Sequence, residues 1–285
     1  MIYKLLSMAL TLWADRQFPD YIDLRRFTLY GVFARLMLSL GVGRQNGIIG
    51  YVLLTALPAL IVVMVIGVFG IFDPLKIPLW ALVLYFCLPE ESLSKAVGAL
   101  RGAVASGKPE EVTVAAAALA GQENLQGDVS AMAQRGLFAV QPLQLVSLFF
   151  WFLLLGIGAA VFYRLNLELL RTPVLEGSKQ AFLRARVQQV LGILEWLPAR
   201  LLIIAYALAG QFNAGIRPLF GSSPDGGAMR EGLLSRLQRA GTGAAGIAGA
   251  EFGDQAVADG WRLVSRALIG LLIVFGVLAL MQGFK

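Results

Sequence analysis

The chain has 285 residues, of which 58% are hydrophobic and 15% are charged, whereas an average soluble domain carries about 25% charged residues. It contains no histidine and one cysteine, Cys87, which excludes internal disulfides, the usual zinc and iron ligand sets and histidine-based triads. The high apolar and low charged content predicts a membrane protein. The net charge is +6, but the basic residues are spread along the chain without a run. This distribution argues against binding of nucleic acid and makes anionic membrane lipids the expected partner.

The first elements predicted along the chain are two helices at the membrane surface. Residues 1–16 contain a short apolar run but no small-x-small cleavage site, so we expect a retained first helix with Asp15 and Arg16 at an interface. Residues 17–47 alternate arginines with apolar residues at helical spacing, which predicts an amphipathic helix lying along the bilayer.

The segment Ile48–Phe72 carries no charge and, at about 1.5 Å per residue, is long enough to cross a hydrocarbon core of about 30 Å. A turn at Asp73–Lys76 and the shorter apolar run Ile77–Leu88 follow. Together these segments predict a helical hairpin in the membrane.

Residues 90–136 alternate charged residues with alanines, which predicts a water-facing helical insert with turns near Gly107 and Gly121. The motif Ser92-Leu-Ser-Lys95 resembles the SxxK of penicillin-recognising enzymes, but the companion SDN and KTG elements are absent. We therefore expect Ser92 or Ser94 to lie at a helix start.

The remaining strong spans are Leu143–Tyr163, with Tyr163 and Arg164 as an interface anchor, and Trp261–Met281. Between them, residues 211–260 are Gly-rich and predict a loop region with one amphipathic helix near 231–239. The run Gly241-Thr-Gly-Ala-Ala-Gly246 matches GxGxxG, but no strand-like run precedes it. It predicts a small-residue helix packing surface or a flexible loop.

The segment Gln188–Gly210 carries Glu195, Pro198 and Arg200 inside an apolar run. Charges at membrane depth are costly unless they face protein or each other, and proline disturbs a regular helix. The sequence therefore predicts a kinked or broken helix whose Glu195 and Arg200 form a pair. Two interpretations remain open: a structural pair that locks helix packing, or a ligand or relay site.

The string Glu195-Trp-Leu-Pro198-Ala-Arg200-Leu, followed by Tyr206-Ala-Leu-Ala-Gly210, resembles the signature of the AmpE family of Gram-negative inner-membrane proteins. The length, the early Asp15-Arg16, the Ala-rich segment and the closing span are also similar to that family. The resemblance implies a regulatory membrane protein associated with induction of chromosomal β-lactamase and antibiotic resistance.

AmpE proteins are similar to CobD, the membrane enzyme that joins an amino-alcohol to a corrinoid carboxylate, and both families share the Pro-x-Arg-Leu core. Counting back from Phe150-Trp151, the acidic and amide cluster of CobD corresponds here to four other residues: Arg135, Ala139, Val140 and Leu143. These four residues are not the acids and amide of CobD, and a shared fold does not by itself carry a shared function. The comparison therefore implies that this chain has lost the CobD chemistry. A CobD-like enzyme and a small-molecule binding or transport protein remain the alternatives.

The sequence thus predicts an all-α polytopic membrane protein of the bacterial inner membrane, with four to five hydrophobic helices, extramembrane helical inserts and one domain over 1–285. We expect no catalysis, no cofactor and no metal. Partners besides lipid would be another envelope protein or a cell-wall-derived small molecule. The candidate ligand-binding residues are Asp15, Arg16, Tyr163, Arg164, Glu195, Trp196 and Arg200.

Overall fold

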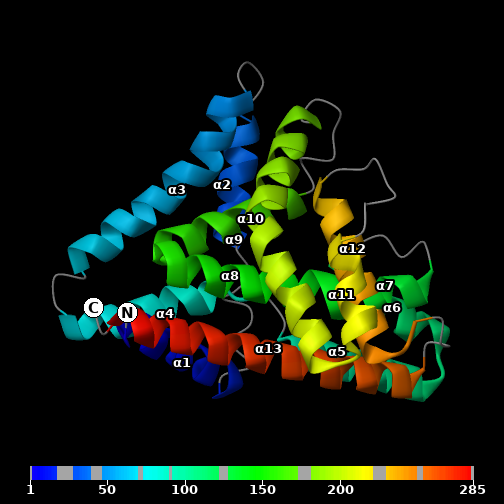
Figure 1. The fold of residues 1–285 in the computed structure, drawn as a ribbon. Coiled ribbons are helices and arrows are strands. Elements are labelled where there is room, and N and C mark those ends of the chain that lie inside the picture. Colours follow the sequence, from blue (N-terminus) through cyan, green and yellow to red (C-terminus); the bar gives the residue numbers. More distant parts are fainter. Residues whose placement is uncertain are drawn as a thin grey trace. The chain divides into compact units, whose positions relative to one another are not determined.

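The structure is a computed structural model that describes residues 2–17, 28–39, 47–69, 73–89, 92–121, 128–172, 181–220, 229–248 and 253–283. Within these ranges every regular element is a helix, and strands are absent. Figure 1 shows the helices in chain order. The predicted all-α fold is therefore confirmed.

The chain divides into two compact units. Unit 1 comprises residues 1–90, 147–194 and 276–285, and unit 2 comprises residues 91–146 and 195–275. The divisions fall inside three helices: α8 (Gln141–Leu155), α10 (Ala181–Ala209) and α13 (Asp254–Gly283).

Unit 1 contains five further helices: α1 (Ile2–Gln17), α2 (Thr28–Ser39), α3 (Gly47–Phe69), α4 (Asp73–Cys87) and α9 (Ile157–Arg171). The principal packing partners are α1 with α4 and α3 with α9. Side-chain hydroxyls support the first of these pairs, because Ser7 donates to the Ile77 carbonyl at 3.1 Å and Thr11 to the Ala81 carbonyl at 3.1 Å. The two helices of the predicted hairpin, α3 and α4, therefore pack mainly against other helices: α3 against α9, and α4 against α1.

The α3–α9 contact depends on a small residue. A Cβ on Gly158 would collide with the side chain of Val63, so this position permits close approach of the two helices. Gly156 has a different role: its φ of 93° is a conformation that glycine adopts most readily, and it separates α8 from α9. The predicted span Leu143–Tyr163 was therefore wrong as one helix.

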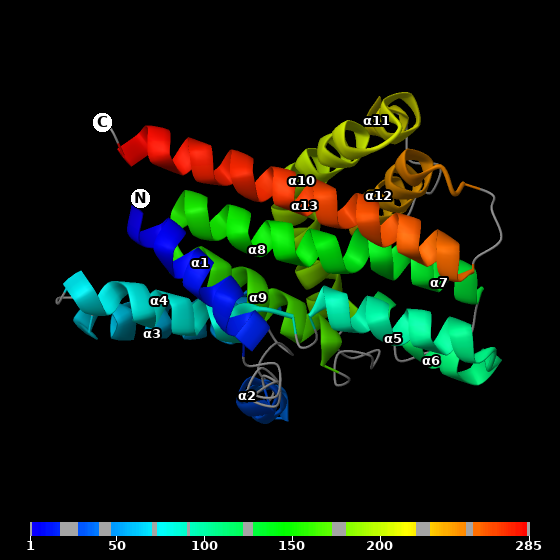
Figure 2. The same ribbon diagram turned by 90° about the horizontal axis from the view of Figure 1, so that it is seen from below.

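Unit 2 begins with three helices, α5 (Leu93–Ser106), α6 (Pro109–Ala120) and α7 (Val129–Arg135), and α5 and α6 lie side by side (Figure 2). Ser92 caps α5 by accepting a hydrogen bond from the Lys95 amide. Gly107 and Gly121 end α5 and α6 in the left-handed conformation, with φ 69° and 64°. The predicted helical character and the predicted turns of the 90–136 segment are confirmed.

The π-helical segment η2 (Gly136–Val140) joins α7 to α8, so that residues 129–155 form one helical run. η2 is fully packed: Leu137, Phe138 and Ala139 have no exposed surface. Tyr206 on α10 donates its phenolic hydrogen to the Phe138 carbonyl at 2.8 Å. This carbonyl lies in the π-helical segment, where the regular i to i−4 hydrogen bonds of the α-helix are interrupted.

Unit 2 also contains α11 (Phe212–Phe220) and α12 (Met229–Ala245), which pack against each other. The predicted loop over 211–260 was therefore wrong for most of its described residues. Small residues there serve packing: a Cβ on Gly241 would strike the Phe138 ring, and one on Gly243 would meet the backbone of Ala214 at 3.0 Å. The helix-packing interpretation of the GxGxxG run is confirmed.

Among the described residues, four helical runs are long and apolar enough to cross a membrane: Ile48–Val68, Val129–Leu155, Ala181–Ala209 and Asp254–Leu278. Lys76–Cys87 is a shorter apolar helix. These segments are consistent with the predicted polytopic membrane protein. Helix α10 contains Pro198 without a break, so the broken form of the predicted kinked or broken helix was wrong, and the kink stays a prediction.

Candidate functional site

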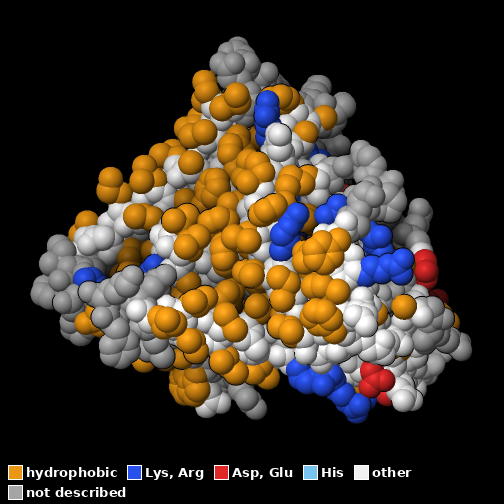
Figure 3. All heavy atoms as spheres, viewed as in Figure 1, with side chains coloured by type: hydrophobic (Ala, Val, Ile, Leu, Met, Phe, Trp, Pro, Cys, Tyr) orange, Lys and Arg blue, Asp and Glu red, His pale blue; other side chains and the backbone are white. Residues whose placement is uncertain are grey.

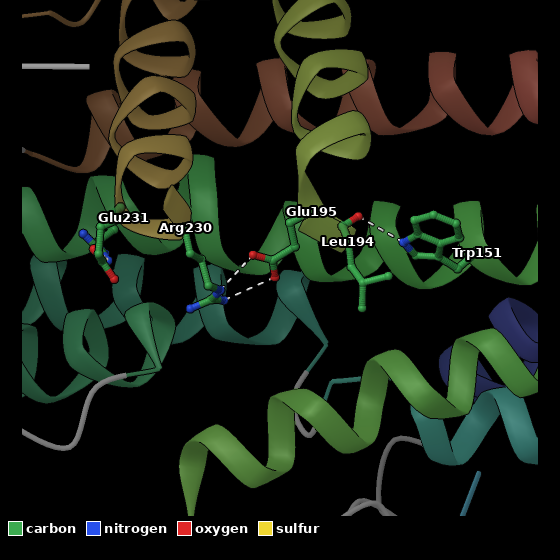
Figure 4. A network of polar contacts seen from close by, with 6 residues as sticks. Trp151, Leu194, Glu195, Arg230 and Glu231 are labelled. Atoms are coloured by element: carbon green, nitrogen blue, oxygen red, sulfur yellow. Dashed lines mark hydrogen bonds and ion pairs between the residues drawn. The ribbon is translucent and has the colours of Figure 1, made fainter. Parts of the chain in front are cut away.

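The most deeply buried charge contact of unit 2 joins α10 to α12. Glu195 has no exposed side-chain surface, and Arg230 exposes only 12% of its side chain. Arg230 Nε donates to Glu195 Oε2 at 2.8 Å and its Nη2 donates to Oε1 at 3.3 Å. Figure 4 shows the two groups facing each other from their separate helices. This bidentate geometry is the strongest form of an arginine–carboxylate contact.

The next residue along α12 makes a second ion pair. Glu231 accepts from Nη2 of Arg135 at the end of α7. Since Arg230 and Glu231 are adjacent at the start of α12, that turn is held to α10 by one residue and to α7 by the next. The first turn of α12 thereby fixes three helices of unit 2 relative to one another.

Arg200, the partner predicted for Glu195, makes different contacts. The five-residue spacing places the two side chains about 140° apart around a regular helix. The Arg200 guanidinium lies 3.7 Å from the Trp196 ring centroid, and Nη1 donates to the Trp196 carbonyl at 3.3 Å. The predicted Glu195–Arg200 pair was wrong, and Glu195 pairs with Arg230 instead.

Arg200 and Trp196 form a surface feature of unit 2. Trp196 exposes 42% of its surface, and the charge of Arg236 on α12 acts on that of Arg200. In the described ranges no carboxylate forms an ion pair with Arg200 or Arg236, and Arg236 Nε is buried without a hydrogen-bond partner. Two guanidinium groups close enough to act on each other can together bind an anion.

In unit 1, α9 carries a polar cluster inside the core. Arg164 is 1% exposed, and its Nη2 lies 2.6 Å from Glu168 Oε1, one helical turn away. Tyr51 on α3 donates to Asn166 Oδ1 at 2.8 Å. The neighbouring Tyr163 is buried. Tyr163 and Arg164, predicted as an interface anchor, therefore lie in the core of their unit.

The predicted site residues are divided between the units. Asp15, Arg16, Tyr163 and Arg164 belong to unit 1, and Glu195, Trp196 and Arg200 belong to unit 2. Asp15 is half-buried on α1, and the Arg16 side chain lies outside the described part of the structure. The described contacts place Glu195 in an ion pair and Arg200 against Trp196.

Sequence reasoning missed several residues of these clusters, among them Arg230, Glu168 and Asn166. Glu168 could have been found, because Arg164 and Glu168 have the i,i+4 spacing of helical ion pairs. Arg230 carries no local signal, since it lies 35 residues from Glu195.

The described residues contain no group of three or more Cys, Asp, Glu or His side chains placed to hold a metal ion. The guanidinium and indole groups of the Arg200–Trp196 surface offer charge recognition and stacking. Comparisons of the chain with protein-family models, with curated proteins and with solved structures found no match.

Proposed function

We propose that the chain is a non-catalytic accessory protein of the bacterial inner membrane that acts in envelope signalling linked to β-lactamase induction, as its resemblance to the AmpE family implies. The four candidate membrane-spanning helical runs support a polytopic membrane location. Arg200 and Trp196 are the residues through which we propose that a partner protein or a cell-wall-derived small molecule is recognised.

One observation carries the non-catalytic part of the proposal. The positions that correspond to the acidic and amide cluster of CobD have no free carboxylate here. Ala139 and Leu143 have no exposed surface and Val140 exposes 7%, while Arg135 pairs with Glu231. An amide ligase acting on phosphate-bearing substrates needs carboxylates that position cations, and these residues supply packing instead.

The test compares a strain lacking the gene with its parent, in a bacterium that has an inducible chromosomal β-lactamase. We expect deletion to change β-lactamase induction and to leave cobalamin-dependent growth unchanged. We also expect the purified protein, with or without Mg²⁺, to form no corrinoid amide. Amide formation would favour the CobD-like alternative, and unchanged induction would contradict the signalling role.

A further inference from the structure

A groove of about 650 Å³ lies in unit 2 between the end of α12 and the N-terminal half of α13. Ala244 and Ala245 supply its α12 side. Its polar lining comes from α13 and consists of Asp259, Arg262, Ser265 and Arg266, with Trp261 beside them. The groove is therefore shaped largely by the face of one helix.

The charged lining favours an anion. Arg262 Nη1 donates to Asp259 Oδ1 at 3.0 Å, which offsets one of the two guanidinium charges. Arg266 Nε donates to the Arg262 carbonyl at 3.3 Å, and within the described ranges no carboxylate pairs with Arg266. Two guanidinium groups against one carboxylate leave the groove with an excess of one positive charge.

Ser265 adds an unfilled hydrogen-bonding position. Its Oγ is buried and makes no hydrogen bond to a described residue, although it lines the groove. A buried hydroxyl without a partner is unfavourable. Because the Oγ atom is closed to solvent in this rotamer, a ligand oxygen in the groove would satisfy it once the side chain turns toward the groove. Arginines and a hydroxyl together match the oxygens of a phosphate group.

The surface beyond the groove is apolar. Along the same helix, Ile269, Ile273 and Val274 expose 57%, 61% and 52% of their surfaces, and Arg262, Arg266, Ile269 and Ile273 follow one another at helical spacings of four, three and four residues. Figure 3 shows hydrophobic side chains over the C-terminal part of α13 and basic ones over its N-terminal half. This segment belongs to a candidate membrane span.

We propose that the groove binds the headgroup of an anionic phospholipid, with the phosphate on Arg262, Arg266 and Ser265 and an acyl chain along Ile269 and Ile273. Trp261 and the arginines then occupy the membrane interface, where aromatic and basic residues are favoured. The aliphatic stripe is what selects a lipid rather than free phosphate, because a free ion makes no use of it.

The test measures binding of phosphatidylglycerol, phosphatidylcholine and inorganic phosphate to the full chain in detergent at fixed ionic strength. We expect phosphatidylglycerol to bind more tightly than phosphatidylcholine, and Arg262→Gln/Arg266→Gln to weaken it by about tenfold or more. Arg239→Gln is the matched control, since Arg239 is an exposed arginine of α12 outside the groove lining. It should leave the affinity unchanged.

If the double variant does not fold, Arg266→Gln alone replaces it in the binding measurement. This single substitution breaks no ion pair to a described carboxylate. Ser265→Ala should weaken phosphatidylglycerol binding while leaving thermal stability unchanged or higher, a combination that a merely structural hydroxyl would not give. Equal affinity for the two lipids, an equal loss in Arg239→Gln, or displacement of the lipid by equimolar inorganic phosphate would each overturn the proposal.

Discussion

Glu195 and Arg230 form a bidentate ion pair in which the carboxylate is fully buried and the guanidinium nearly so. Removing one member of a buried ion pair takes this counter-charge from the other member, which water does not reach to replace it. The contact therefore holds α12 to α10 in unit 2, and its strength can be measured separately from the surface contact of Arg200.

We expect Glu195→Gln to lower the free energy of unfolding by roughly 3 to 5 kcal/mol, because the substitution removes the charge from a buried bidentate ion pair with Arg230. Arg200→Gln is the control, because it removes no ion pair to a described carboxylate: it removes a cation–π contact worth about 0.5 to 1 kcal/mol and an exposed hydrogen bond to the Trp196 carbonyl. Thermal or denaturant unfolding in detergent gives both values. Similar losses in the two variants would contradict the assignment.

A double-mutant cycle on Glu195 and Arg230 tests the pairing itself. We expect a coupling of about 0.5 to 3 kcal/mol between Glu195→Gln and Arg230→Gln, and partial recovery when the charges are exchanged as Glu195→Arg with Arg230→Glu. Additive losses in the cycle would mean that each residue depends on some other partner.

Gly241 permits the close approach of α12 to Phe138. Gly241→Ala should therefore destabilise the chain by about 1 to 3 kcal/mol through overpacking. Gly102 is the matched control: it lies inside α5, and a Cβ there would meet no atom within 4 Å. Gly102→Ala should be neutral or stabilise by up to about 1 kcal/mol, because alanine favours a helix. The packing account is wrong if both substitutions stabilise.

Tyr30 makes the stability of unit 1 depend on alkaline pH. Burial, and secondarily the charge of Glu168, raise the pKa of the Tyr30 phenol above its ordinary value. The folded chain then keeps the phenolic proton at pH values where the unfolded chain loses it, so this contribution is complete below about pH 10 and is lost as pH rises further. Unfolding of the wild type and Tyr30→Phe from pH 8 to 11 should show a steeper loss in the wild type. If the stability of both proteins fell in parallel with pH, the raised pKa of Tyr30 would be contradicted.

The sequence predicted the parts of the fold that depend on neighbouring residues. Gly107 and Gly121 were recognised as turns, and a helix start was recognised at Ser92 or Ser94, of which Ser92 is the cap, because each acts within a few residues of its own position. Ile48–Phe72 was recognised from its uncharged length, and the structure forms α3 over Gly47–Phe69.

Tertiary packing decided the parts that the sequence did not predict. The Gly-rich segment after residue 211 has weak helix propensity, yet α11 and α12 form and pack together, with Gly241 of α12 against Phe138 and Gly243 of α12 against Ala214 of α11. The partner of Glu195 was missed for a related reason: an arginine 35 residues away is brought to it only by the fold.

The most direct test of the proposed function measures β-lactamase induction per molecule of membrane-inserted protein, in a deletion strain complemented with single variants. The account predicts that Arg200→Ala lowers induction at normal protein abundance, because the exposed Arg200–Trp196 surface is the proposed recognition site. Glu195→Gln should instead lower abundance and induction in proportion. Wild-type induction by Arg200→Ala at normal abundance, or a loss that merely follows abundance, would contradict the account.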